Sequence, residues 1–502
     1  MRSTRAQLAG ILLAGLGLRL LFLRVHQTIE RDGVLYASVA EHLAGAGRLM
    51  DLRERYHTFY PPGYPALIAP VYALVGDSHR AGQIVSLTAG LALIVLVGLV
   101  GRRVGGERVG LLAAGLTAIY PPFVHGAVAV LTESTDAALL CLLVLVELRL
   151  VGRPGRTGSA LAGLLVGGMY LVRPEGLLLA AGFAGLVIAG LARREARARV
   201  GGWVVAFALA LLLAVVPYVL YLHAITGSWH LSGKGLAYWI GEAPLQFDAI
   251  AFGPPQPRPW RGLGVEAALF AERYLRNFFR QEGVITEAVS LLALGLGAVG
   301  LAAGTRWRGR VAEEVVLLSA FVPLLLYPAF DVVERWTEPY MAILFVFVAR
   351  GVAWLADRPE TPARSRAVAW GLVGLLALRY GPQLAIPLRY TPGFELVEQR
   401  DAGRWVRDRF GAGTSVMSRI PDIAYYARAR WVALPYAEIP SVIGAARREG
   451  VTFVVLDELT TRRLRPELLP LLEGPAPPGL TLVHQTDEFP GRRVRVFAVG
   501  AP

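Results

Sequence analysis

Residues 28–65, TIERDGVLYASVAEHLAGAGRLMDLRERYHTFYPPGYP, form a polar segment directly after the first apolar run of the chain. Apolar side chains recur at helical spacing over residues 34–44, which predicts a short helix lying along a membrane surface. Consecutive prolines in the corner 61–65 cannot continue a helix, so we expect the chain to turn back toward the bilayer there. A segment this rich in acids and arginines, placed between two apolar spans, predicts the location of the active site.

The composition of the chain predicts an integral membrane protein. Of its 502 residues 54% are hydrophobic and only 18% are charged, and the mean hydropathy is +0.48. The net charge of +13 comes from arginine, since Lys234 is the sole lysine, and most arginines lie in short loops between apolar runs. These arginines indicate topology and lipid-headgroup contact rather than nucleic-acid binding. The single cysteine, Cys141, excludes an internal disulfide.

Arginine-rich loops alternate with loops that carry few arginines. Under the positive-inside rule this pattern places the N-terminus in the cytoplasm and predicts roughly eleven spans of about 15–25 residues. The odd number of spans leaves the C-terminal region outside the cell membrane. We therefore expect a multi-pass transmembrane domain over residues 1–390, with external regions at 26–66 and 224–287, and an extracytoplasmic α/β domain over residues 391–502.

The C-terminal region has the alternating pattern of a small α/β domain. Helices are predicted at 397–410 and 439–449, and strands at 415–418, 431–434, 451–457, 480–484 and 493–499, the last two as edge strands. A G-x-G-x-x-G turn is missing, so no dinucleotide site is predicted.

Acidic residues gather at the corners that this topology places outside, and two arginines accompany them. Ionisable groups near membrane depth are candidates for function. The residues are Glu30, Asp32, Glu133, Asp136, Glu175, Asp331, Glu334 and Glu338, with Arg173 and Arg335. Structural roles alone would also explain some of them. Glu133 and Asp136 fall in the first turn of a predicted helix, where the helix dipole favours acids.

Several short motifs, spread over nearly the whole chain, resemble one known family. They are Asp32-Gly33 with Tyr36, Ala40-Glu41-His42-Leu43, Pro61-Pro62-Gly63-Tyr64-Pro65, Leu131-Thr132-Glu133, Leu171-Val172-Arg173-Pro174-Glu175, Glu334-Arg335-Trp336, and Arg419-Ile420-Pro421-Asp422-Ile423-Ala424-Tyr425-Tyr426-Ala427. The pattern resembles GT-C superfamily glycosyltransferases that use polyprenyl-phosphate sugars. It is most similar to bacterial members of glycosyltransferase family 39, the protein mannosyltransferases and lipid A aminoarabinose transferases.

This resemblance implies a GT-C-like fold and a sugar donor carried on a polyprenyl phosphate, with a glycan, lipid or protein as acceptor. Asp32 matches the family's catalytic carboxylate and would act as general base in an inverting displacement on the outer face of the membrane. Arg335 and Arg173 would bind the donor phosphate. Candidates for contacting or orienting the sugar or acceptor are Glu30, Glu133, Glu175, Tyr36 and His57.

One departure from the family pattern concerns a metal. The family often has Asp-Glu where this chain has Asp32-Gly33, so the second acid either comes from Glu30 or Glu133 or is absent. A divalent metal ion therefore stays open as a cofactor, with Asp32 and Glu133 as its candidate ligands.

Two other classes of protein stay open at this stage. A multi-span transporter or a flippase for lipid-linked sugars would also show many spans and ionisable residues. The clustering of acids on one side, the large external domain and the lack of internal repeats favour the transferase. A non-catalytic membrane scaffold does not explain the acid-rich first loop.

Overall fold

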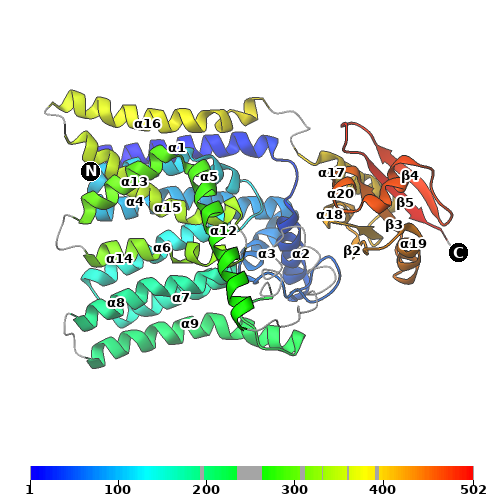
Figure 1. Cartoon of the computed structure of the whole chain (residues 1–502), viewed down its shortest axis with the longest axis horizontal. Coiled ribbons are helices and arrows are strands. Elements are labelled where there is room, and N and C mark those ends of the chain that lie inside the picture. Colours follow the sequence, from blue (N-terminus) through cyan, green and yellow to red (C-terminus); the bar gives the residue numbers. More distant parts are fainter. Residues whose placement is uncertain are drawn as a thin grey trace.

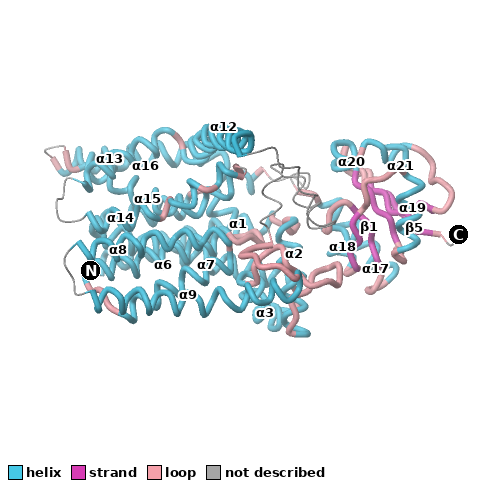
Figure 2. Tube along the Cα trace, turned by 60° about the horizontal axis from the view of Figure 1, so that its bottom comes forward, coloured by secondary structure: helices cyan, strands magenta, loops and turns pink. Residues whose placement is uncertain are grey.

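The computed structural model describes residues 2–192, 197–233, 263–305, 311–330, 332–358, 361–389 and 395–500. A bundle of long helices makes up most of the molecule, and a small sheet with its own helices lies beyond one end of it (Figure 1). Figure 2 shows the same separation, with the strands and the C-terminal helices beyond one end of the bundle. A mostly helical chain with a small C-terminal sheet was predicted, and both features are confirmed.

A series of helices forms the bundle. They are α1 (Arg2–Val25), α2 (Arg31–Ala46), α3 (Gly63–Val75), α4 (Ser78–Ile119), α5 (Pro121–Gly126), α6 (Glu133–Gly152), α7 (Arg156–Val172), α8 (Ala180–Ala192), α9 (Arg197–Thr226), α12 (Leu263–Val289), α13 (Leu291–Thr305), α14 (Val311–Ser319), α15 (Glu334–Ala356) and α16 (Pro362–Leu384). Short 3₁₀ turns occur at η1 (Pro174–Leu179), η2 (Val322–Leu325), η3 (Tyr327–Ala329) and η4 (Ile386–Leu388).

Many of these helices can cross a membrane. Among the described residues, five are long and apolar enough, and the number rises to seven if each of two bent helix pairs counts as one span. The figure of eleven spans stays a prediction. The long helix α4 is interrupted at Gly106, whose φ of 84° lies in the left-handed region that glycine tolerates, so two straight segments meet there. Of the predicted external region 224–287, residues 234–262 lie outside the described part of the chain.

Helix α2 starts three residues before the predicted helix and is more enclosed than predicted. Residues Asp32 to Ala40 are all buried, although a surface helix would expose one face. Side chains of α3, α4 and the C-terminal region pack around α2 in one hydrophobic cluster, and they cover the face that was expected to meet water or lipid headgroups. The predicted helix is therefore present but enclosed by other parts of the chain, and its place at the membrane surface stays a prediction.

The C-terminal region forms a five-stranded sheet with the order β2-β1-β3-β5-β4. Its strands are β1 (Ser415–Ser418), β2 (Arg430–Ala433), β3 (Phe453–Asp457), β4 (Leu480–Thr486) and β5 (Val494–Val499). Strand β1 pairs in parallel with β2 and β3, and β5 runs antiparallel between β3 and β4. All five predicted strands are present within two residues at each end, but β5 is paired on both sides and so is not an edge strand.

Helices cover this sheet and link it to the bundle. They are α17 (Val397–Phe410), α18 (Asp422–Ala427), α19 (Ile439–Arg448), α20 (Glu458–Leu464) and α21 (Leu469–Glu473). Two neighbouring tyrosines of α18 reach the bundle: the Tyr426 hydroxyl accepts a hydrogen bond from the Ile29 amide at 2.8 Å, and the Tyr425 hydroxyl lies 2.8 Å from Ser78 Oγ. In addition, the Trp431 amide of β2 donates to the Leu52 carbonyl at 2.8 Å. The sheet is therefore held against the end of the bundle that carries the polar segment.

Candidate active site

Close packing brings the start of α2 against the segment that precedes α6. A Cβ atom built at Gly33 would lie 2.8 Å from the Val130 carbonyl oxygen, so no larger residue fits there without movement. This contact explains in physical terms why an acid does not follow Asp32 in this chain. It also places Asp32 near Glu133, three residues after Val130.

Asp32 is held by two donors from other parts of the chain. The Tyr60 hydroxyl donates to Asp32 Oδ1 at 2.7 Å, and the Arg335 guanidinium forms an ion pair with Asp32 Oδ2 through Nη2. Burial, together with the negative charge of Asp32, raises the pKa of Tyr60 well above its usual range. Tyr60 therefore stays protonated and keeps donating to the carboxylate.

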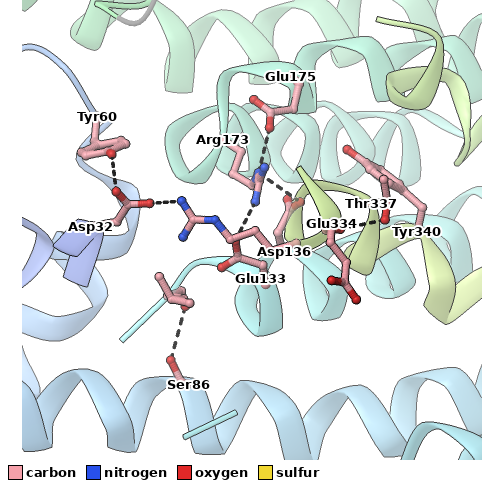
Figure 3. A network of polar contacts seen from close by, with 12 residues as sticks. Asp32, Tyr60, Ser86, Glu133, Asp136, Arg173, Glu175, Glu334, Thr337 and Tyr340 are labelled. Carbon is pink, nitrogen blue, oxygen red and sulfur yellow. Dashed lines mark hydrogen bonds and ion pairs between the residues drawn. The ribbon is translucent and has the colours of Figure 1, made fainter. Parts of the chain in front are cut away.

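A second arginine organises the acids behind this pair (Figure 3). Arg173 lies between Glu133, with Nη1 to Oε1 at 3.3 Å, and Glu175, with Nε to Oε1 at 2.8 Å. Its Nε is also 3.9 Å from an oxygen of Asp136. Glu133 Oε1 in turn lies 3.9 Å from Nε of Arg335, so Glu133 connects the two arginines.

The two arginines differ in how much of each side chain is exposed. Arg335 is 34% exposed, whereas Arg173 is 5% exposed and is surrounded by three carboxylates. A ligand phosphate can reach Arg335 but not the enclosed guanidinium of Arg173. This geometry favours Arg335 as a phosphate contact and Arg173 as a positioning residue for the acids.

His57 and Tyr36 support Tyr60. His57 Nε2 accepts a hydrogen bond from the Tyr60 amide at 3.0 Å, and His57 Nδ1 lies 2.9 Å from Asp51 Oδ2. Hydrogen bonds from His57 and Arg53 outweigh the burial of Asp51 and lower its pKa. The Tyr36 ring packs against the Tyr60 ring with their centroids 4.9 Å apart. His57 thus holds the polar loop in place, and the structure gives it no direct approach to Asp32.

Glu30 does not join this network. Its carboxylate lies 2.7 Å from His26 Nε2 and accepts a hydrogen bond from the Val130 amide at 3.0 Å. Burial alone would raise the pKa of Glu30, but the adjacent His26 outweighs it and lowers the value to about 2. Of the two acids considered as a partner for Asp32, Glu133 is therefore the one that the fold brings to Arg335 and Asp32.

The residues around Asp32 do not fit a divalent metal ion in this arrangement. Both oxygens of Asp32 have donors, and the space between Asp32 and Glu133 is taken by a cation, Arg335. Metal sites need carboxylates that are free to coordinate. Asp32 and Glu133 were the candidate ligands in the sequence, and we derive no catalytic step through a metal at this position.

Some members of the network were not singled out from the sequence. Tyr60 directly precedes the proline corner at 61–65, yet nothing in the spacing indicated that its hydroxyl would reach Asp32. The Tyr327 hydroxyl donates to Glu175 Oε1 at 3.1 Å and lies 3.1 Å from the Tyr340 hydroxyl. Tyrosines near apolar runs are common at membrane interfaces, so the acids that they contact could only be found in three dimensions.

Comparisons with known proteins agree with the predicted resemblance. A family model described as dolichyl-phosphate-mannose-protein mannosyltransferase matches residues 60–221. No curated protein matches the chain.

Solved structures share the fold over most of the chain, and three of them are described here. ArnT from Cupriavidus metallidurans, bound to undecaprenyl phosphate, has a TM-score of 0.65 at 13% identity and covers 98% of both chains. The oligosaccharyltransferase AglB from Archaeoglobus fulgidus, in complex with an inhibitory peptide and a dolichol-phosphate, has a TM-score of 0.64 at 15% identity, over 91% of this chain and 70% of AglB. AglB in complex with Zn and sulfate has a TM-score of 0.63 at 17% identity, over 90% of this chain and 68% of AglB. The resemblance to GT-C glycosyltransferases is thus confirmed for the fold.

Proposed function

We propose that the protein transfers a sugar from a polyprenyl-phosphate carrier to an acceptor hydroxyl, with Asp32 as general base. The ion pair between Asp32 and Arg335, at the end of a GT-C-like bundle, is the observation that carries this proposal. It places a carboxylate, which can take a proton, beside an exposed guanidinium, which can bind a phosphate in bidentate fashion.

Charge balance suggests how the donor prepares the base. In the structure, Arg335 neutralises Asp32, so Asp32 Oδ2 is not available to a substrate hydroxyl. A donor phosphate competes for the same guanidinium, because phosphate oxygens bind arginine as strongly as a carboxylate does. Binding of the donor would therefore free Asp32 Oδ2 at the moment when a base is needed.

The proposed reaction is a single displacement. The acceptor oxygen forms a bond to the anomeric carbon, its proton passes to Asp32, and the bond from the anomeric carbon to the phosphate oxygen breaks. Polyprenyl phosphate leaves with the bonding electrons, and Arg335 stabilises its additional negative charge. One displacement inverts the configuration at the anomeric carbon. Glu133 and Arg173 would keep Arg335 in place through the contacts described above.

We place this chemistry on the outer face of the cell membrane, with the C-terminal sheet on the same side. Arginines of α4 contact the ends of two other helices: Arg103 Nη2 donates to the Leu148 carbonyl of α6, and Arg108 pairs with Asp357, just after α15, at 2.6 Å. The N-terminus lies at the end of the bundle opposite the sheet (Figure 1), and Arg5, near the N-terminus, lines one cavity together with Arg102 of α4. The positive-inside rule assigns that end to the cytoplasm.

A thiol-labelling experiment tests this orientation. Cys141 is buried, so single exposed cysteines can be introduced in a Cys141→Ser background. Ser441→Cys in α19 should react with a membrane-impermeant thiol reagent in whole cells, and Thr157→Cys at the start of α7 should not. The opposite pattern would place Asp32 in the cytoplasm and contradict the proposed side of the reaction.

Transfer by the purified protein tests the function itself. The protein in nanodiscs is supplied with undecaprenyl phosphates that carry different hexoses or pentoses, and the products are identified by mass spectrometry. Nuclear magnetic resonance of the product gives the anomeric configuration, which should be opposite to that of the donor. Movement of the donor between leaflets without any transfer would instead support a flippase and overturn the proposal.

A further inference from the structure

A second polar cluster lies beside the candidate active site and takes no part in the proposed reaction. His26 follows the last residue of α1, Glu30 precedes α2, and His125 lies in α5. One ligand atom from each of these side chains lies within 4.8 Å of the other two. The cluster therefore brings together three segments that are separate in the sequence, with two imidazoles and one carboxylate at a common point.

The surroundings of His26 are those of a metal-ligating histidine. Its Nδ1 lies 2.9 Å from Glu395 Oε1, and its Nε2 lies 2.7 Å from Glu30 Oε1. When Nδ1 donates its proton to Glu395 and Nε2 gives up the proton that it holds toward Glu30, Nε2 presents its lone pair on the side of Glu30 and His125. Metal-bound histidines usually donate their second ring nitrogen to a carboxylate in this way, which fixes the tautomer and the orientation of the ring.

The other groups are also held in position by neighbours. Glu395 Oε2 accepts hydrogen bonds from the amides of Gln27 and Thr28, at 2.7 and 2.9 Å. The second oxygen of Glu30 accepts from the Val130 amide at 3.0 Å, which leaves Glu30 Oε1 for a ligand. The His125 ring lies 5.4 Å from the His26 ring, nearly perpendicular to it, and is exposed, so an ion can enter from its side.

We propose that His26 Nε2, Glu30 Oε1 and a ring nitrogen of His125 form a zinc(II) site, with Glu395 as the outer partner of His26. Two imidazoles and a carboxylate are ordinary zinc ligands, and a set of three leaves the fourth tetrahedral position for water. Zinc–ligand bonds of about 2.0–2.2 Å hold tetrahedral ligand atoms about 3.4 Å apart, so side-chain shifts of about 1 Å complete the site.

A metal ion here would link the end of α1 to α5. Through Glu395 it would also link the end of α1 to the residues just before α17. His26 and Glu30 would then both be metal ligands, so the segment between them would be fixed at both ends. Asp32 lies only two residues after Glu30. The site is distinct from the network around Asp32, in which Arg335 and Arg173 are the cations that pair with the acids. It does not depend on the proposed transferase reaction.

Zinc binding by the full-length protein tests this proposal without any sugar donor. The protein is purified in metal-free buffer, and Zn²⁺ binding is measured by calorimetry and by metal analysis after gel filtration. We expect one Zn²⁺ per chain and a higher melting temperature with Zn²⁺. Bound Co²⁺ should give the intense visible absorption of a tetrahedral site.

Variants separate this site from other sources of binding. His125→Gln changes an exposed side chain and should weaken Zn²⁺ binding by at least about 10-fold, while Glu395→Gln, which removes an outer partner, should weaken it by about 10- to 100-fold. His484→Gln in β4 is the matched control, and Asp32→Asn is the control for the candidate active site; both should bind Zn²⁺ like the wild type.

Two results would overturn the proposal. One is wild-type protein that shows no stoichiometric binding of Zn²⁺, which would make the cluster an ion-pair network only. The other is equal affinity in the wild type, His125→Gln and Glu30→Gln, with loss of binding in Asp32→Asn, which would move the metal to the candidate active site.

Discussion

Two polar clusters lie at the same end of the helix bundle, and they differ in the cations that balance their acids. Around Asp32, the acids face the fixed guanidinium groups of Arg335 and Arg173. Around Glu30, the partners are imidazoles, with His26 between Glu30 and Glu395. Guanidinium groups are permanent cations that bind oxyanions, whereas neutral imidazoles bind metals.

This difference assigns different partners to the two clusters, although Glu30 and Asp32 are only two residues apart. In the cluster at Asp32, Arg335 can exchange its carboxylate partner for a phosphate, because Arg335 is partly exposed. The cluster at Glu30 can exchange a proton for a metal ion. The four predictions below test the separation, in order of their expected effect on sugar transfer.

The largest effect is expected for Asp32→Asn. Asparagine keeps the size of the side chain and can still accept from Tyr60, but it has no basic carboxylate. Sugar transfer should fall at least about 10²-fold, the lower end of what general bases contribute. Transfer rates of purified wild type and variant, at saturating donor, give the comparison.

Glu30→Gln is the matched control for Asp32→Asn, because it changes the acid of the neighbouring cluster. Its effect on transfer should be much smaller. Near-normal transfer by Asp32→Asn, together with loss of transfer in Glu30→Gln, would show that the base has been assigned to the wrong cluster.

A smaller but clear loss is expected for Arg335→Lys. Lysine keeps the positive charge but cannot form two parallel hydrogen bonds with a phosphate. We expect transfer to fall about 10-fold or more, in line with about 1.5–3 kcal/mol for a hydrogen bond to a charged group. Donor binding, measured with undecaprenyl phosphate alone, should weaken in parallel. If this variant turns over and binds the donor normally, Arg335 only has a structural role.

Tyr60→Phe should reduce transfer less, by several-fold. The change removes one hydrogen bond to Asp32 Oδ1, worth about 1 kcal/mol, and leaves the ring packing intact. In the proposed mechanism Tyr60 positions the base without touching the donor, so kcat should fall while KM for the donor stays constant. A change confined to KM would instead place Tyr60 in the donor site.

Much of the fold could be predicted because it depends on local patterns. Apolar runs and alternating strands appear directly in the sequence, so α17 and β1 were predicted with the bounds that the structure shows. The enclosure of α2 could not be predicted, because it depends on the docking of the C-terminal sheet, several hundred residues away.

The candidate site shows the same limit. Asp32, Glu133, Arg173 and Arg335 were predicted from a motif resemblance, and the fold brings all four together. Their pairing depends on distances across helices, which no spacing in the sequence encodes. Tyr60 was missed for this reason, and Glu30 was grouped with Asp32 although its side chain points to a different cluster.

The smallest effect on transfer is expected at Asp422, an acid that belongs to neither cluster. It is the first residue of α18, and its Oδ2 is buried without a hydrogen-bond partner among the described residues. Burial raises the pKa of Asp422 to about 6, and neighbouring Arg31 only partly offsets this, whereas the pKa of Glu30 is lowered by His26. Burial outweighs the attraction of Arg31, so Asp422 should destabilise the fold when it ionises.

The sign of the pH dependence follows from that shift. The folded protein binds the proton on Asp422 more tightly than the unfolded chain does, so ionisation of Asp422 costs stability as the pH rises from about 4 through about 6. A rise from 3.8 to about 6 corresponds to at most about 3 kcal/mol. Asp422→Asn removes this cost and should raise the melting temperature at pH 7.5, with a smaller gain at pH 5 and little change in transfer rate. Melting curves of both proteins at the two pH values measure the difference. An unchanged or lower melting temperature of Asp422→Asn at pH 7.5 would show that Asp422 is already balanced by a cation in the folded protein, as Glu30 is by His26.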